Sequence, residues 1–263
     1  VIDPLLLYSS YLGGMDKESG QAVSVDSSRY IYVAGWTLST NFPGTGPNVR
    51  NNGDADVFVS KFYPDGSNLV FSTYIGGTLD DKALDLAVGT DGTIFVVGVT
   101  DSTNFPSVRG AQPATMGEKD AFVFQLIPAG TDLVFSTYLG GSSNDGAYAL
   151  ERDLDGFLYV AGVTQSTNFP VTNAFQSALG MGDPGDLRQD VFLTKIMANG
   201  SNLVFSTYLG GSSVDGIGLD YLKSPELMHM GLCLASNNAP CVAGCTVSTN
   251  FPVTANAYQV TNE

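Results

Sequence analysis

A sequence unit recurs four times along this chain of 263 residues, and this repeat constrains the fold more than any other feature. One marker of the unit is an aromatic segment closed by a Gly pair; the pairs end at Gly14, Gly77, Gly141 and Gly211, in steps of 63, 64 and 70 residues. The other marker is the segment STNFP, which begins at Ser39, Ser102, Ser166 and Ser248, in steps of 63, 64 and 82 residues. Because two different markers keep nearly the same step, the chain is an array of repeats.

Within each unit the hydrophobic residues follow the periodicity of strands and not that of helices. The second unit shows four apolar runs, at 84–88, 94–100, 120–127 and 133–138. Turns such as Asp91-Gly92 lie between them and favour tight hairpins, because glycine adopts positive φ without steric cost. Each unit is therefore predicted to form a four-stranded antiparallel meander.

Meanders of four strands at a constant spacing are typical of the blades of a β-propeller. The predicted fold class is all-β, a single propeller domain over residues 1–263 with about four blades, the last one incomplete. The repeats lie approximately at 15–77, 78–141, 142–211 and 212–263. Residues 5–14 match the fourth strand of a blade, whereas the last unit supplies only a first and a second strand.

The incomplete ends leave two interpretations open. In the favoured one, residues 5–14 join the last unit as the closing strand of a fourth blade; in the other, the chain is a segment of a longer propeller. The absent third strand leaves an open strand edge, which is a template for pairing with another strand. We therefore expect a protein partner or self-assembly at the blade edge near the termini.

The motifs together resemble a known family. The segments YVAGWT and STNFP, a DAFV-type strand and LVFSTYLGG are similar to the SBBP (β-propeller) repeat, from Leu5 to about Gln259 and most specifically in the first three units. The resemblance implies a secreted, periplasmic or cell-surface protein of a bacterium or archaeon. It implies little about chemistry, because most members have no assigned activity.

Charge narrows the range of partners. The net charge is −15, so phosphate backbones and anionic membrane surfaces are repelled, and no nucleic-acid partner is expected. No run of 18 apolar residues is present, so no membrane-spanning helix is expected either.

Acidic and amide side chains recur in the loops that a propeller brings to one face, here called the rim. Ca²⁺ takes six to eight oxygen ligands, and the candidate ligands are Asp16, Asp80, Asp81, Asp145 and Asp215. Further rim residues are Glu18, Asn144, the strand-opening Asp56, Asp120 and Asp190, and the STNFP residues Asn41, Asn104, Asn168 and Asn250. The alternative, which the recurrence favours, is that each acidic residue caps loop N–H groups. No other cofactor is expected.

Aromatic residues of both markers are expected to pack within and between the blades. The four copies of the STNFP phenylalanine favour a packing role over ligand stacking; they are Phe42, Phe105, Phe169 and Phe251.

The residues most often used in catalysis are scarce and lie in the fourth unit. Its insertion at 219–230 carries the one histidine, His229, after a Ser224-Pro225 pair that resembles a helix start. No G-x-S-x-G motif accompanies it, so the chain is predicted not to be an enzyme; a lyase or hydrolase would rest on His229 alone.

All three cysteines also lie in the fourth unit. A turn at Asn237-Asn238 sets Cys233 opposite Val242 and predicts that no two sulfur atoms come within bonding distance. A bulge would allow one disulfide and leave one free thiol. By number and type, the chain also has enough ligands near one another in sequence for a zinc site: Cys233, Cys241, Cys245 and His229.

The sequence thus favours a non-catalytic extracytoplasmic propeller, acting as a protein-interaction or structural subunit of a larger envelope or filamentous assembly. The alternative is a glycan-binding or Ca²⁺-dependent adhesion module that uses the rim.

Overall fold

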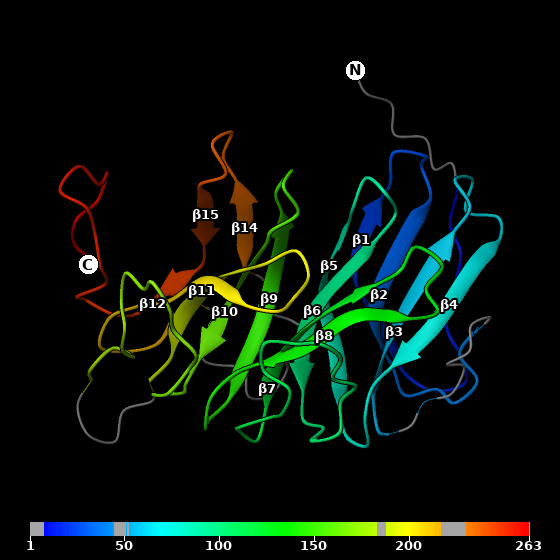
Figure 1. The fold of residues 1–263 in the computed structure, drawn as a ribbon, viewed down its shortest axis with the longest axis horizontal. Coiled ribbons are helices and arrows are strands. Elements are labelled where there is room, and N and C mark those ends of the chain that lie inside the picture. Colours follow the sequence, from blue (N-terminus) through cyan, green and yellow to red (C-terminus); the bar gives the residue numbers. More distant parts are fainter. Residues whose placement is uncertain (1–7, 45–50, 52, 183–187, 217–229, 263) are drawn as a thin grey trace.

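The computed structural model describes residues 8–44, 51, 53–182, 188–216 and 230–262. It confirms the all-β fold class: these residues form strands and no helix, in three four-stranded antiparallel sheets and two small two-stranded ones (Figure 1). Each four-stranded sheet is a simple meander, as expected for a propeller blade.

The strands of the three complete blades follow the chain in order. Blade 1 is β1 (Glu18–Val25), β2 (Ile31–Thr37), β3 (Asp56–Phe62) and β4 (Leu69–Ile75). Blade 2 is β5 (Asp81–Val88), β6 (Ile94–Thr100), β7 (Asp120–Leu126) and β8 (Leu133–Leu139). Blade 3 is β9 (Asp145–Arg152), β10 (Leu158–Thr164), β11 (Asp190–Ile196) and β12 (Leu203–Leu209).

The fourth unit is smaller. It contains β13 (Asp215–Gly216) paired with β16 (Cys245–Thr246), and β14 (Gly231–Leu234) paired with β15 (Pro240–Ala243). These pairs occupy the positions of the first and second strands of a blade, and β14 lies against β9 of blade 3.

The hairpin between the first two strands has the same loop in all four units. A backbone pair such as Asp26 N–H to Tyr30 O closes it around three residues, and the third residue has positive φ. The four third residues are Arg29, Gly92, Gly156 and Asn238. The three-residue loop corrects the register expected for the fourth unit: Cys233 lies opposite Cys241 and not opposite Val242.

Apolar side chains between neighbouring blades form the core. We call the side of a blade that faces the preceding unit its front and the opposite side its back. The cluster between blades 1 and 2 joins back residues such as Tyr32 and Val57 to front residues such as Leu86, Val96 and Phe122. The cluster between blades 2 and 3 repeats this arrangement with Phe95, Val123, Leu150, Val160 and Phe192. Burying such a side chain stabilises the fold by about 1.5–3 kcal/mol, so the blades hold one another in place.

A glycine in the turn between the third and fourth strands receives an aromatic ring from the preceding unit. Gly130 has a φ of 71°, and a Cβ built there would lie 2.2 Å from a ring carbon of Phe71. The same contact joins Gly200 to Phe135 and Gly66 to Tyr8. Tyr8 thus occupies on blade 1 the place that a fourth-strand aromatic residue occupies at the other two junctions.

The expected closing blade is not formed, because the sheets do not close into a ring. Blade 1 and the fourth unit lie at opposite ends of the array (Figure 1), and residues 8–14, instead of pairing with the fourth unit, pack on blade 1 through contacts such as Tyr8 with Gly66.

The turn glycine generates a test of this packing. Replacing Gly130 by Ala should lower the free energy of unfolding by about 2–5 kcal/mol, because left-handed backbone costs a non-glycine residue about 1–2 kcal/mol and overpacking adds about 1–3 kcal/mol. Urea denaturation measures the loss. The matched control is Gly20→Ala, whose Cβ would meet nothing closer than a Val33 methyl group at 3.7 Å. Equal stability of the two variants would contradict the proposed role of the contact.

Candidate functional site on the rim

The rim is held together by a network of hydrogen bonds that centres on a buried carboxylate. In blade 2, Asp81 Oδ2 accepts hydrogen bonds from the Gly77 N–H at 2.6 Å and from the Ser102 hydroxyl at 2.9 Å. Its Oδ1 accepts a short hydrogen bond from Thr100. Asp81 is fully buried. It therefore ties the Gly pair at the end of blade 1 to the STNFP loop of blade 2.

The same arrangement recurs in the other units. Asp145 accepts from Gly141 N–H at 2.6 Å and Ser166 Oγ at 2.7 Å, and Asp215 accepts from Gly211 N–H at 2.6 Å and Ser248 Oγ at 2.9 Å. In blade 1 Glu18 replaces the aspartate and accepts from the Gly14 N–H at 3.1 Å. We call this set of contacts the rim latch.

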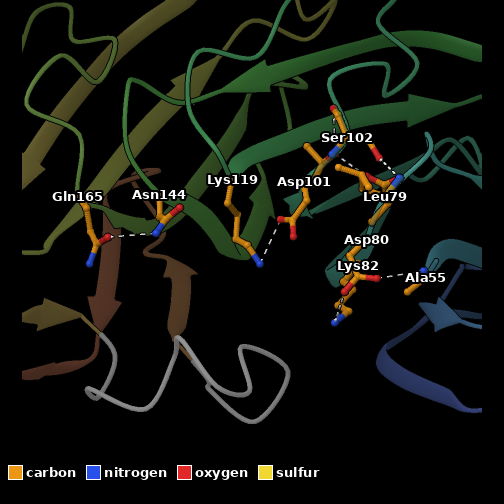
Figure 2. A network of polar contacts seen from close by, with 11 residues as sticks. Ala55, Leu79, Asp80, Lys82, Asp101, Ser102, Lys119, Asn144 and Gln165 are labelled. Atoms are coloured by element: carbon orange, nitrogen blue, oxygen red, sulfur yellow. Dashed lines mark hydrogen bonds and ion pairs between the residues drawn. The ribbon is translucent and has the colours of Figure 1, made fainter. Parts of the chain in front are cut away.

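Serine and asparagine of STNFP complete each latch by accepting hydrogen bonds from the preceding loop. Ser102 Oγ accepts from the Leu79 N–H at 2.9 Å, as Figure 2 shows, and Asn104 Oδ1 accepts from the Thr78 N–H at 3.1 Å. Equivalent bonds are made by Ser39, Asn41, Ser166, Asn168, Ser248 and Asn250. The serine and the asparagine of the motif thus use their side-chain oxygens to hold the conformation of the preceding loop.

The phenylalanine of STNFP is a packing residue at the three complete blades. Phe105 stacks on Phe122 with ring centroids 4.6 Å apart, and Tyr138 donates a hydrogen bond to the Ser102 carbonyl at 3.0 Å. The corresponding rings are Phe42 with Phe58 and Phe169 with Phe192. These contacts confirm the packing interpretation for Phe42, Phe105 and Phe169.

A second buried aspartate lies beside each of three latches, at the start of the third strand of the preceding blade. A Cβ built on Gly140 would lie 2.2 Å from Asp120 Oδ1 and 2.8 Å from Asp145 Oδ2, so these two carboxylates flank the same glycine. Asp56 and Asp81 flank Gly76 in the same way, and Asp190 lies beside Gly210. All five aspartates are buried.

Burial changes the acidity of these groups. It raises the pKa of Asp81 and of Asp145 to about 7, against the stabilising hydrogen bonds of the latch, and the neighbouring carboxylates add to the increase. The pKa of Asp190 rises to about 6 for the same reason, and that of Asp120 rises as well. The rim therefore contains carboxyl groups that hold protons near neutral pH.

The predicted calcium ligands fall into two groups. Asp81, Asp145 and Asp215 are latch residues, whereas Asp80 accepts from the Ala55 N–H at 3.1 Å and forms an ion pair with Lys82 at 3.1 Å (Figure 2). Asp16 accepts from the Lys17 N–H at 2.9 Å. These bonds agree with the capping alternative. Within the described part of the chain no three His, Cys, Asp or Glu side chains are grouped to hold a metal ion, and calcium binding stays a prediction.

Two polar features were missed in the sequence. A threonine two residues before the STNFP serine accepts its N–H, as Thr100 does from Ser102 at 3.0 Å; the recurring T-x-S pattern was a visible signal. The other is Asp85, whose Oδ2 accepts from the Leu150 N–H at 2.8 Å. Asp85 and Glu151 line an open groove of about 440 Å³ between the first strands of the blades. Asp85 has no acidic counterpart in the other units, so the repeat gave no signal for it.

His229, Ser224 and Pro225 lie outside the described residues, as does most of the insertion at 219–230. No helix among the residues that the structure describes is long and apolar enough to cross a membrane.

Comparison with known proteins supports the repeat. The family model described as the beta-propeller repeat SBBP matches residues 7–43 and 134–170. Each match runs from a segment that ends in a Gly pair to the end of STNFP, and so contains one complete rim latch. The chain is also 30% identical over 146 residues to the regulatory protein FlaEY of Caulobacter vibrioides; the match covers 53% of this chain and 15% of that protein.

The rim latch can be tested at its serine. Ser102→Ala removes a donor to buried Asp81 and an acceptor of the Leu79 N–H, so the free energy of unfolding should fall by about 1–3 kcal/mol. Denaturation in urea, with hydrogen exchange of residues 77–81, measures the effect. The control Ser28→Ala removes an exposed hydroxyl and should change stability by less than about 0.5 kcal/mol. A loss no larger than the control's would show that the latch does not stabilise the rim.

The buried carboxyl groups predict how stability depends on pH. Asp81 and Asp145 have folded pKa values of about 7, above the value of an unfolded aspartate near 3.9. Between these values the folded state binds more protons, so the free energy of unfolding should fall as pH rises from about 4 to about 8. Chemical denaturation across this range measures the slope.

A pair of variants assigns that slope to the buried aspartates. Asp120→Asn should raise stability at pH 8 and flatten the slope, since it removes a buried charge beside Asp145. Asp132→Asn, at an exposed position of the same blade, should leave the slope unchanged. Stability that rises with pH, or an equal response of both variants, would refute the assignment.

Proposed function

We propose that this chain is a non-catalytic β-propeller-repeat module that assembles head to tail with a second copy of itself, as a subunit of an extracytoplasmic envelope or filamentous structure. The front of blade 1 would receive the back of the fourth unit of the next copy.

The exposed front of blade 1 is the observation that carries this proposal. Val23 is 69% exposed, whereas the residues at the same repeat position, Leu86 and Leu150, are 6% and 4% exposed. A groove of about 240 Å³ remains beside it, lined by Ile31, Val33 and Phe62 together with Tyr8 and Leu12. The equivalent fronts of blades 2 and 3 are each covered by the back of the preceding blade. The back of a blade is therefore the kind of surface that fits the front of blade 1.

The fourth unit offers part of such a surface. Its front residues Leu232 and Val242 pack on blade 3, while Cys241 and Ala243 on its back are exposed. Cys241 and Ala243 occupy the repeat positions of Tyr32 and Ala34, which cover the front of blade 2. One chain thus carries the front of a blade-to-blade junction and part of the matching back, and such heterologous contacts generate rings or filaments.

Other properties of the chain favour binding over catalysis. The recurring polar residues of the rim are engaged in the latch, and a net charge of −15 disfavours nucleic acid and anionic membranes as partners. Similarity to a protein named as regulatory favours a binding role. The extracytoplasmic location is supported by the resemblance to the SBBP repeat.

Sedimentation velocity over the micromolar range tests the proposal. The unmodified chain should form dimers or larger species in a concentration-dependent manner, and Val23→Asp should weaken this association by roughly tenfold or more, because it places a charge in an apolar junction. A chain that stays monomeric throughout would overturn the proposal.

The control for this variant is Leu154→Asp, which makes the same chemical change at a hairpin loop of blade 3 where the side chain is 95% exposed. It should associate like the unmodified chain. If both variants weaken association equally, added negative charge and not the front of blade 1 is responsible.

A further inference from the structure

We propose that Cys233 and Cys241 form a cross-strand disulfide when a disulfide-bearing oxidant is present, and that Cys245 stays a free thiol. This inference does not depend on self-assembly.

The register of the fourth unit carries the proposal. Cys233 on β14 and Cys241 on β15 are direct cross-strand partners. Directly opposed residues of an antiparallel pair have Cα atoms about 4.5–5.5 Å apart, and disulfides need Cα separations of about 4.4–6.8 Å. The bond can therefore form without a bulge or a shift of register.

The hairpin loop fixes this register. The Ala235 N–H donates to the Ala239 carbonyl at 2.9 Å, and Asn238 adopts a left-handed φ of 60°. Counting outward from that closing pair, Leu234 meets Pro240 and Cys233 meets Cys241. Pro240 lacks an N–H, but it lies between two hydrogen-bonded pairs of the ladder, where no N–H is needed.

Both thiols are accessible. Cys233 and Cys241 are exposed on the back of the hairpin, opposite the face on which Leu232 and Val242 pack against blade 3. Local desolvation and the adjacent Cys241 thiol raise the pKa of Cys233, so oxidation should speed up as pH rises.

The third cysteine lies on a different ladder. Cys245 pairs with Gly216 of β13. It is four residues from Cys241 along the chain, and four residues of extended strand span about 13 Å. This distance excludes a disulfide from Cys245 to Cys241 while the strands are intact, and Cys233, opposite Cys241, is similarly remote.

The oxidation step is ordinary thiol–disulfide exchange with a glutathione-type disulfide. One cysteine thiolate attacks the oxidant, forming a mixed disulfide and releasing one glutathione thiolate. The second thiolate attacks the mixed disulfide, forms the Cys233–Cys241 bond and releases the second glutathione. Two protein thiols are oxidised and one glutathione disulfide is reduced to two thiols.

Thiol counting and peptide mapping of the whole chain test this proposal. After equilibration in a glutathione buffer with reduced glutathione in large excess over its disulfide, so that a single exposed thiol such as Cys245 stays reduced, the denatured chain should show one free thiol of its three, without bound glutathione. Cleavage after Leu234 separates Cys233 from the peptide that carries Cys241 and Cys245, so the two peptides should remain joined until reduction, and the serine variants below decide which of these two cysteines is bonded. Three remaining thiols, or a different cysteine pair, would overturn the proposal.

Single serine variants assign the pair independently of the mapping. Cys245→Ser should retain the disulfide and show no free thiol, whereas Cys233→Ser and Cys241→Ser should lose the intramolecular bond. An intramolecular bond in either of the last two variants would also overturn the proposal. Because Cys233, Cys241 and Cys245 are exposed, none of these changes disturbs the core.

Discussion

Apolar contact between successive blades is the interaction on which the rest of the structure depends. A single four-stranded sheet exposes two faces, and in this chain both faces of blade 2 are apolar. Each apolar face stays exposed to water until a neighbouring blade covers it. The stability of the fold therefore depends on the junctions between blades and not on single blades. A partly exposed ion pair such as Lys119–Asp101 contributes about 0–1 kcal/mol, which is less than one well-buried aromatic side chain of a junction contributes.

The rim latch is the polar counterpart of these junctions. A carboxylate at the start of each first strand holds the preceding Gly pair and the STNFP loop of its own unit, as Asp81 does in blade 2 and Glu18 in blade 1. Sequence motifs far apart in each repeat thus meet at one point. This explains why the two markers recur together, and why their recurrence indicates structure more than chemistry.

The architecture was predictable because each strand pattern is local and each is repeated. The meander, the packing of Phe105 and the capping alternative for Asp81 followed from residue types and spacing. The register of the fourth unit did not, because one loop residue decides it: the left-handed Asn238 makes the hairpin loop three residues long. Gly92 and Gly156 at the same position of blades 2 and 3 were the available clue. The pairing of Asp120 with Asp145 across a junction could not be predicted, since it depends on how neighbouring blades are placed in space.

The glycines of the repeat distinguish two reasons for which a position requires glycine: lack of space for a Cβ and a left-handed backbone. At the turn that receives an aromatic ring, Gly66, Gly130 and Gly200 are all glycine, because the ring fills the space of a Cβ. At the first hairpin loop the backbone is equally left-handed, yet Arg29 and Asn238 occur beside Gly92 and Gly156. Around Gly92 the nearest atom would be 3.4 Å from a Cβ, so a side chain there carries only a conformational cost. The chain therefore contains its own comparison of homologous sites: invariance among its repeats marks steric exclusion, and variation marks strain that a folded blade can tolerate.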